Sequence, residues 1–318
     1  MDLQETTDGS EQRFSAYIDR LASVIGHADR IGPLHDYCAG LVMPGERKSV
    51  EPMAAVTAPA RVSAQHQSLL HFVSEAPWSD EKILAKVREQ VLPAMERHGP
   101  INAWIFDDTA FPKHGEHSVG VARQYCGQLG KQDNCQAAVS LSIANHHASL
   151  PVAYRLYLPK EWASDKKRRR KVGVPDEIKF KTKPKIAADQ LRWACEAGLP
   201  RGVVLMDAGY GVDAALRATI TSLDLRYVAG IRGNMVVLPS GKDQKPAATE
   251  KLALALPKRA WTTIEWREGT NGTLASRFAR ARVRVPCRAK KKTESQLEEW
   301  LLIEWPPDEK KPDRKSVV

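Results

Sequence analysis

The sequence predicts an α/β fold, in which a mixed sheet with flanking helices lies between an N-terminal helical domain and a β-rich insertion. Three observations lead to this class. Apolar residues recur at three- and four-residue spacing up to about residue 96, short apolar runs alternate with helical stretches over 101–233, and strand-like runs fill most of 234–318. We therefore expect a helical domain at 1–100, an α/β core at 101–233, and a β-rich insertion with a loose tail at 234–318.

The N-terminal domain is predicted to contain three amphipathic helices. Their sequences are RFSAYIDRLASVIG, SAQHQSLLHFVSEA and SDEKILAKVREQVLPAMERHG, each with apolar residues on one helical face. Ser79 and Asp80 supply an N-cap for the third helix, and Gly99-Pro100 ends it. Residues 1–100 are therefore expected to fold as a separate helical unit.

The core begins with three predicted strands, NAWIF, CQAAVSLSIAN and LPVAYRLYL. A helix, KPKIAADQLRWACEAG, follows them, and then the strand GVVLMD, the helix DAALRATITSL and the strand RYVAGI. Three strands followed by helix, strand, helix and strand is the order of an RNase H-like core. Downstream, the runs MVVLP, WTTIEW, RFARARVRV and EEWLLIEW predict further strands, and the proline-broken end PPDEKKPDRKSVV predicts the tail.

The composition favours a folded protein with an anionic partner. Hydrophobic residues make up 42% and charged residues 27%, which is typical of a globular chain and excludes a largely disordered one. Lys and Arg number 48 against 38 Asp and Glu, so the formal charge is +10. This excess favours a polyanion such as DNA, although many basic proteins bind no nucleic acid.

Cysteine usage and hydropathy indicate an intracellular environment. The five cysteines are scattered and lack the paired spacing of a zinc site, so we expect reduced thiols. They are Cys38, Cys126, Cys135, Cys195 and Cys287. No apolar run approaches the roughly 20 residues that span a bilayer, and the acidic N-terminus does not resemble a signal peptide. We therefore predict a cytoplasmic protein without membrane contact.

Two apolar runs end abruptly in carboxylates. WIFDDTAFPKHG contains Asp107 and Asp108, and GVVLMDAGYG contains Asp207. If the two strands lie side by side in one sheet, these acids share an edge where they can hold Mg²⁺, and two such ions would promote in-line displacement at a phosphodiester. Each aspartate alone is equally well explained as a turn or helix cap.

The sequence around these acids resembles a known family. DDTAFPKHGEHSVGVARQYCGQLGKQDNCQAAVSL, PVAYRLYLPKEWA, EIKFKTKPKIAADQL, VVLMDAGYGVD and WREGTNGTLASRFARARVRV are similar to bacterial insertion-sequence transposases of the DDE superfamily endonuclease group, in particular the family numbered 701. The resemblance extends from Ile101 to about Trp305. It implies an RNase H-like enzyme that cuts and joins DNA with Mg²⁺ or Mn²⁺.

Site residues follow from the resemblance. Asp108 matches the first catalytic and metal-binding aspartate and Asp207 the second, with Asp107 as an additional metal ligand and Thr109 as a residue that orients a carboxylate. The implied partners are the terminal inverted repeats and target DNA. A helical DNA-binding domain at 1–100, a homo-oligomer on DNA and association with the nucleoid are also implied.

The third acid of the family, a glutamate on a helix, has no counterpart that we recognise. Glu265, Glu268, Glu299 and Glu304 follow Asp207, but each falls in a strand-like run. We therefore expect a C-terminally truncated relative with impaired catalysis, and a non-catalytic DNA-binding regulator of transposition is the alternative. A haloacid-dehalogenase-like phosphatase is disfavoured because its second Asp follows two residues after the first, whereas here the two acids are adjacent.

Two groups of residues are candidates for DNA contact. Lys113, His117, Arg123 and Gln124 lie within the matched signature after the first acids. The basic run comprises Lys166, Lys167, Arg168, Arg169, Arg170 and Lys171, and Lys179, Lys181, Lys183 and Lys185 follow it. We expect this run to follow phosphates from a flexible loop. The alternatives are a polar hairpin for the first group and a solvated basic loop for the second.

Overall fold

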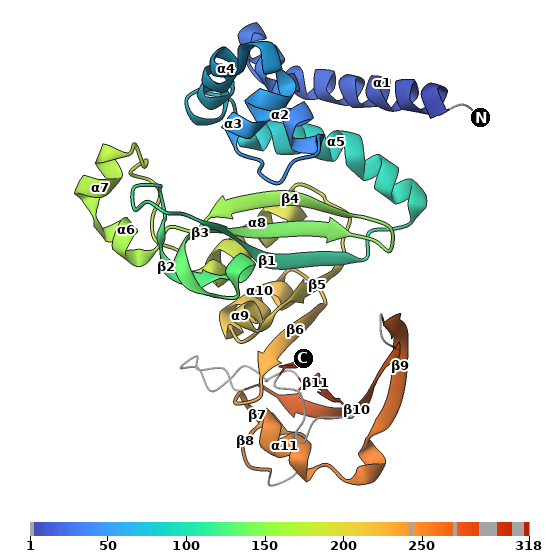
Figure 1. Cartoon of the computed structure of the whole chain (residues 1–318). Helices are drawn as coiled ribbons and strands as arrows, with labels where there is room; N and C mark the ends of the chain where they lie inside the picture. The colour runs from blue at the N-terminus through green and yellow to red at the C-terminus, as the bar shows by residue number, and fades with distance from the viewer. Residues whose placement is uncertain (1–2, 242–243, 270–271, 286–297, 307–314, 318) are drawn as a thin grey trace. The chain divides into compact units, whose positions relative to one another are not determined.

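The computed structural model describes residues 3–241, 244–269, 272–285, 298–306 and 315–317. The chain forms two compact units, Met1–Arg97 and His98–Val318. Figure 1 shows the helical first unit in blue and the α/β second unit in green to red. No helix among the described residues is long and apolar enough to cross a membrane.

The N-terminal unit is a group of helices around two small apolar clusters. The helices are α1 (Leu3–Ala22), α2 (Ile31–Val42), α3 (Val50–Thr57), α4 (Val62–Ser74) and α5 (Asp80–His98), the last of which runs into the second unit. One cluster joins Ile18, Leu34 and Phe72 of three helices. The N-cap predicted for α5 is present, since Ser79 Oγ accepts a hydrogen bond from the backbone N–H of Lys82 at 3.3 Å.

The second unit is built on a mixed sheet in the strand order β4-β3-β1-β5-β6, with the short strand β2 beside β3. Its strands are β1 (Ala103–Pro112), β2 (Ala122–Cys126), β3 (Lys131–Ala144), β4 (Ser149–Leu156), β5 (Val203–Met206) and β6 (Tyr227–Arg232). β3 is antiparallel to β1 and β4, whereas β5 is parallel to both β1 and β6. The predicted RNase H-like mixed sheet is confirmed.

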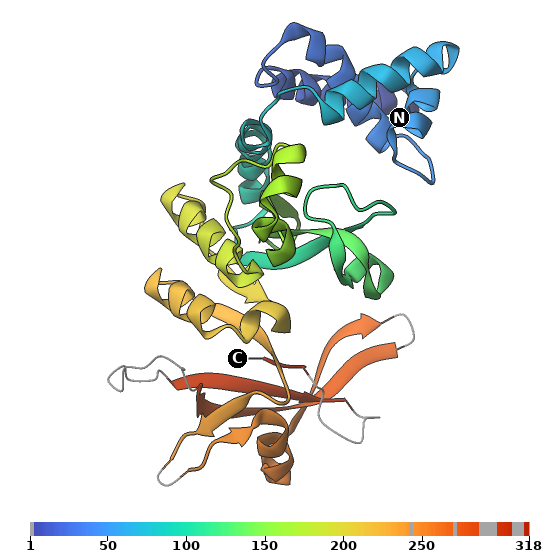
Figure 2. The same ribbon diagram turned by 90° about the vertical axis from the view of Figure 1, so that its left-hand side faces the viewer.

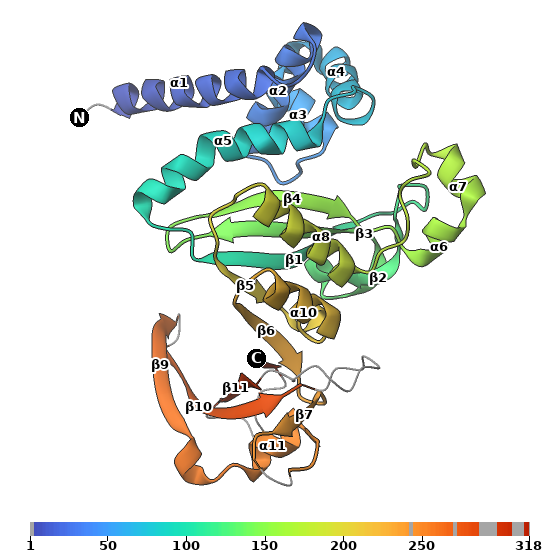
Figure 3. The same cartoon turned by 180° about the vertical axis from the view of Figure 1, so that it is seen from behind.

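Helices cover one face of this sheet, as Figure 3 shows. They are α8 (Lys183–Glu196) between β4 and β5 and α10 (Ala214–Ser222) between β5 and β6, and the shorter α6 (Lys160–Ser164), α7 (Lys166–Lys171) and α9 (Ala208–Gly211) connect them to the strands. Gln190 Nε2 donates to the carbonyl oxygen of Val139 at 3.1 Å, which fastens α8 to β3. Leu191 of α8 and Ile220 of α10 are fully buried.

A second sheet occupies the C-terminal part of the unit, as predicted. It contains β7 (Val236–Pro239), β8 (Ala247–Ala248), β9 (Thr262–Gly269), β10 (Gly272–Arg284), β11 (Glu298–Trp305) and β12 (Lys315–Val317), with α11 (Thr249–Ala255) before β9. Figure 2 shows α11 as the short orange helix beside these strands. Ala253 of α11 packs with Ile231, Val283 and Ile303 in one buried cluster.

Part of the expected tail has regular structure. Lys315–Val317 form β12, which pairs with both β6 and β11, while 307–314 lie outside the described residues. Backbone pairing explains this difference from the expectation, because the N–H and C=O groups of β6 and β11 gain partners from the backbone of β12. The two sheets are thereby continuous.

The cysteines are free thiols wherever they are described. Cys126 and Cys135 are buried, and Cys38 and Cys195 are partly buried. Cys287 lies outside the described residues.

Candidate active site

Strand β1 separates the two adjacent aspartates because successive side chains of a strand point to opposite faces. Trp104 and Phe106 are buried on the face covered by helices, and Asp108 follows them on that face. Asp107 points to the other face and is exposed, with its Oδ1 accepting a hydrogen bond from the backbone N–H of Asp108 at 2.7 Å. The strand therefore directs Asp108, and not Asp107, toward the helices.

Asp207 follows β5, the strand next to β1. The parallel register between β1 and β5 ends at the pair Phe106 and Met206, so Asp207 lies one residue beyond it and Asp108 two residues beyond it. The strand β1 does not end at the acids as the sequence led us to expect, because its backbone stays paired with β3 as far as Pro112. The Asp207 carboxylate caps α9 by accepting the backbone N–H of Gly209 at 2.8 Å. Both a turn role and an active-site role of Asp207 are thus compatible with its geometry.

Two glycines bring α9 close to the sheet. A Cβ at Gly211 would lie 2.1 Å from the carbonyl oxygen of Gly230 on β6, and a Cβ at Gly230 would lie 3.0 Å from the backbone nitrogen of Ala208. No other residue type fits such an approach. Gly211 and Gly230 therefore allow α9 to pack closely on β6, and this packing brings Tyr210 to Asp108 of β1.

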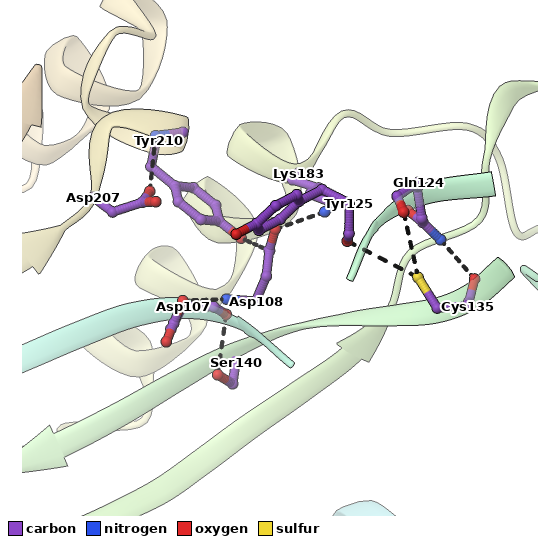
Figure 4. A network of polar contacts seen from close by, with 10 residues as sticks. Asp107, Asp108, Gln124, Tyr125, Cys135, Ser140, Lys183, Asp207 and Tyr210 are labelled. Carbon is purple, nitrogen blue, oxygen red and sulfur yellow. Dashed lines mark hydrogen bonds and ion pairs between the residues drawn. The ribbon is translucent and has the colours of Figure 1, made fainter. Parts of the chain in front are cut away.

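Tyr210 links the segment after β5 to Asp108 of β1 (Figure 4). Its hydroxyl donates a hydrogen bond to Asp108 Oδ1, and its ring lies 6.2 Å from that of Phe106. Burial raises the pKa of the Tyr210 hydroxyl far above its ordinary value, and the charges of Asp108, Asp207 and Asp107 raise it further. Tyr210 is therefore a neutral phenol that donates to a carboxylate.

Lys183 takes the other oxygen of Asp108. Its Nζ lies 2.6 Å from Asp108 Oδ2, and the two side chains are 26% and 34% exposed. Lys183 stands at the start of α8, where Thr182 Oγ1 caps the helix by accepting the backbone N–H of Lys185 at 3.4 Å. The site thus consists of two acids from neighbouring strands with a lysine and a tyrosine on Asp108.

Sequence reasoning did not find Tyr210 and assigned Lys183 only to a basic stretch. The one local signal for Tyr210 is its place between two glycines directly after a strand-end acid, in DAGYG. For Lys183 there is no local signal, because its partner Asp108 is 75 residues away. Both contacts depend on how α8 and α9 cross the sheet.

The donor chemistry of the site suits a hard divalent cation. Asp108 and Asp207 offer carboxylate oxygens at the edge of the sheet, and Mg²⁺ is often held by one or two carboxylates together with water and substrate phosphates. Among the described residues, however, no group of three or more His, Cys, Asp or Glu side chains is placed to hold a metal ion.

Glu299 lies away from the two acids. It accepts a hydrogen bond from the hydroxyl of Tyr227 at 2.7 Å, and Tyr227 pairs with Val204 at the opposite end of β5 from Asp207. Three residues of strand separate Val204 from Asp207, or about 10 Å. Glu299 thus links β11 to β6.

The other three glutamates are equally unsupported as a third acid. Glu304 accepts a hydrogen bond from Ser276 Oγ at 2.8 Å within the C-terminal sheet. Glu265 is exposed on β9, and the side chain of Glu268 lies outside the described residues. The structure therefore brings none of the described glutamates to Asp108 and Asp207.

The first group of predicted DNA contacts lies in and beside the β1–β2 connection. His117 and Arg123 are exposed, whereas Lys113 and Gln124 are partly buried. Gln124 Nε2 donates to the carbonyl oxygen of Cys135 at 2.9 Å. His117 and Arg123 are accordingly the most available members of this group.

The basic run forms a helix instead of the expected flexible loop. Asp165 caps α7 by accepting the backbone N–H of Arg168 at 2.9 Å, which explains why six consecutive basic residues are ordered. Arg168 donates to the carbonyl oxygen of Glu116 and stacks on Trp162, 3.6 Å from the ring centroid. The basic helix and the β1–β2 connection are therefore neighbours.

One arginine of the run is buried. Arg169 is 7% exposed, and its guanidinium donates to the carbonyl oxygens of Pro175 at 2.6 Å, Ile178 at 2.9 Å and Ala163 at 3.3 Å. These bonds hold the segment after α7. The exposed members are Lys166, Lys167, Arg170 and Lys171, and Arg168 is partly exposed, so burial removes only Arg169 from the predicted DNA contacts of the run.

Comparison with known proteins points to one family. A model described as DDE superfamily endonuclease matches residues 20–273. The probable transposase for insertion sequence element IS701 of Microchaete diplosiphon is 31% identical over 172 residues, which cover 54% of this chain and 42% of that protein. This chain thus aligns with less than half of the length of that relative, and both acids fall within the matched model.

Proposed function

Because this chain belongs to the DDE superfamily endonucleases, we propose that it acts in the transposition of an insertion sequence, by metal-dependent cleavage and transfer of DNA strands at the element ends. The observation that carries the proposal is that one acid lies on β1 and another directly follows its parallel neighbour β5. Asp108 of β1 and the acid that follows β5, Asp207, both lie close enough to Tyr210 for their charges to raise its pKa. A structural role for a turn aspartate does not require such a pair.

Asp108 and Asp207 would hold the divalent cation, Mg²⁺ or Mn²⁺, and Asp107 on the other face of β1 is a weaker candidate. When bound, the cation would polarise the phosphodiester and lower the pKa of an attacking water. Tyr210 and Lys183 fix the Asp108 carboxylate through its two oxygens. Their role in this proposal is to orient that group before substrate arrives.

DNA is the partner that the surface favours. Lys166, Lys167, Arg170 and Lys171 are exposed on α7. His117 is exposed directly after Glu116, which α7 contacts, and Arg123 is exposed on β2. These side chains are suited to phosphate contacts, which are independent of base sequence. We further infer that the chain works as a homo-oligomer on DNA, since an element has two ends to be joined.

A second function is favoured by one observation. The described residues contain no group of three metal ligands, and two carboxylates hold Mg²⁺ less firmly than three. A chain with the same DNA contacts and weak metal binding would occupy element ends without cutting them. Such a non-catalytic regulator would bind the same DNA as the transposase but would not cleave it.

A nicking assay with a matched pair of variants separates the two functions. Asp207→Asn and Asp213→Asn each change an aspartate that caps a helix, α9 or α10, and asparagine is an equally good cap. We expect the full chain to cut duplexes carrying the element's own termini in Mg²⁺ or Mn²⁺. Asp207→Asn should abolish cutting, and Asp213→Asn should retain it. Protection of the termini without cutting by the unaltered chain would establish the regulator instead.

A further inference from the structure

Both oxygens of Asp108 are engaged by the chain's own donors. Tyr210 donates to Oδ1, and the ammonium group of Lys183 lies 2.6 Å from Oδ2. The pair is partly shielded from water, since the two side chains are only 26% and 34% exposed. Such shielding preserves the attraction between the charges. A divalent cation that approaches Asp108 therefore meets a carboxylate that is already paired with the positive charge of Lys183.

Lys183 is anchored at its backbone, and its ammonium group has a second neighbour besides Asp108. Its Cα belongs to the first turn of α8, which Thr182 caps and Pro184 helps to start. The ammonium group also lies 5.4 Å from the centroid of the Tyr157 ring, a neighbour that stabilises a cation independently of Asp108. The four-carbon side chain can thus leave the carboxylate without any movement of the helix.

We propose that Lys183 is an internal counter-ion of Asp108 that competes with the divalent cation for Oδ2. In the metal-free protein it neutralises a carboxylate that stands near Asp107 and Asp207. When the cation binds, the ammonium group leaves Oδ2 and becomes available to a phosphate of the substrate DNA. The proposal rests on the proposed function only in taking Asp108 as a metal ligand.

A nearby lysine provides a control of the same type. Lys181 Nζ lies 2.5 Å from Asp189 Oδ2, and its side chain is 40% exposed. Lys181 therefore carries the same charge, two residues away, and pairs with an acid outside the site. Replacing either lysine removes one positive charge, but only Lys183→Gln frees Asp108.

The experiment is a Mn²⁺ titration of the full chain without DNA, in which free Mn²⁺ is followed by its electron paramagnetic resonance signal. Lys183→Gln should bind Mn²⁺ about tenfold more tightly than the unaltered chain, because a like charge close to the cation has been removed. Lys181→Gln should match the unaltered chain. Adding Asp108→Asn to Lys183→Gln should abolish the gain. Circular dichroism of each variant checks that the fold is retained.

Equal or weaker Mn²⁺ binding by Lys183→Gln contradicts the proposal, as does an equal gain in Lys181→Gln or the absence of binding in every variant. The result is independent of cleavage. If the chain cuts DNA but Lys183→Gln leaves Mn²⁺ affinity unchanged, the counter-ion role fails and the endonuclease stands. If Lys183→Gln binds Mn²⁺ more tightly but no variant cuts, the counter-ion role stands and the endonuclease fails.

Discussion

Tyr210 lies 102 residues after Asp108 and donates its phenolic hydrogen to that carboxylate. The bond joins the segment after β5 to β1. Its loss therefore tests how strongly these two parts of the core are held together. Because the Tyr210 side chain is 3% exposed, water reaches its hydroxyl poorly. The strength of this contact can be measured by removing one oxygen atom.

Tyr210→Phe should lower the free energy of unfolding by about 1.5 to 3 kcal/mol, the usual loss for a hydrogen bond to a charged group. Cleavage should fall as well, because Asp108 then retains only Lys183. Urea denaturation gives the first quantity and the nicking assay the second. Tyr154→Phe is the control, since Tyr154 is 46% exposed on β4 and should be neutral. Equal effects of the two substitutions would show that the Tyr210 bond contributes nothing.

Gly211→Ala should destabilise the protein by about 2 to 3 kcal/mol, as overpacking of a close contact does. The new Cβ would lie 2.1 Å from the carbonyl oxygen of Gly230, so α9 must move away from β6 and take Tyr210 with it. Thermal unfolding and cleavage should both show the loss. Gly127→Ala places its Cβ in open space and should change neither; a tolerated Gly211→Ala would mean that α9 is not seated as described.

Arg169→Ala should lower the free energy of unfolding by about 3 kcal/mol, because three carbonyl oxygens lose a charged donor in a buried place. Arg170→Ala, one residue later and exposed, should change stability by less than about 0.5 kcal/mol. Urea denaturation of the two variants tests the assignment. If Arg169→Ala weakens DNA binding while stability is retained, the residue is a DNA contact after all.

The four exposed basic residues of the run should set part of the salt dependence of DNA binding. Replacing Lys166, Lys167, Arg170 and Lys171 with Gln should reduce the slope of log K against log salt by about 0.9 for each phosphate that is no longer neutralised. Fluorescence anisotropy over a salt series measures this slope. The control removes the same charge from Lys245, Lys251, Lys258 and Arg259 near the C-terminal sheet and should leave the slope unchanged. Equal slopes in both variants would refute a specific role for α7.

Tyr227 should make stability depend on alkaline pH. Burial raises the pKa of its hydroxyl, and the hydrogen bond to Glu299 raises it further. The folded protein therefore keeps the proton above pH 10.0, the ordinary value, where the unfolded chain loses it. The contribution of the Tyr227 hydroxyl to the free energy of unfolding is fully present below pH 10.0. Above pH 10.0 this contribution declines by at most about 1.4 kcal/mol per pH unit. Tyr227→Phe should show a shallower decline in urea denaturation between pH 9 and 11, and parallel curves would contradict the prediction.

Local sequence was sufficient for the arrangement of the core. The runs WIF and VVLM are apolar and buried on the face covered by helices and partly buried on the other, and the first charged residue then follows the buried stretch. Asp207 follows β5 as predicted, whereas β1 continues past Asp107 and Asp108 to Pro112 because its backbone stays paired with β3. The order of strands and helices predicted the mixed sheet.

Composition alone could not distinguish neighbouring residues of the same type. Arg168, Arg169 and Arg170 have identical chemistry, and only the rotation of α7 and its packing place Arg169 inside and Arg170 outside. The basic run likewise contained no sign of its ordering, which depends on Asp165 and on the contact with Glu116. A run of basic residues therefore does not predict that every side chain in it is exposed, because backbone carbonyl oxygens can bind one of them in the interior, as they do for Arg169.

The sequence by itself determined that the apolar runs of two strands in an RNase H-like sheet give way to acids, because that conclusion needs only periodicity and burial along each strand. The tertiary structure decided which of Asp107 and Asp108 faces the helices and which donors hold it. Those bonds join residues 75 and 102 positions apart. Their formation depends on the path of α8 and α9 across the sheet and on the glycines that allow that path, which no local pattern encodes.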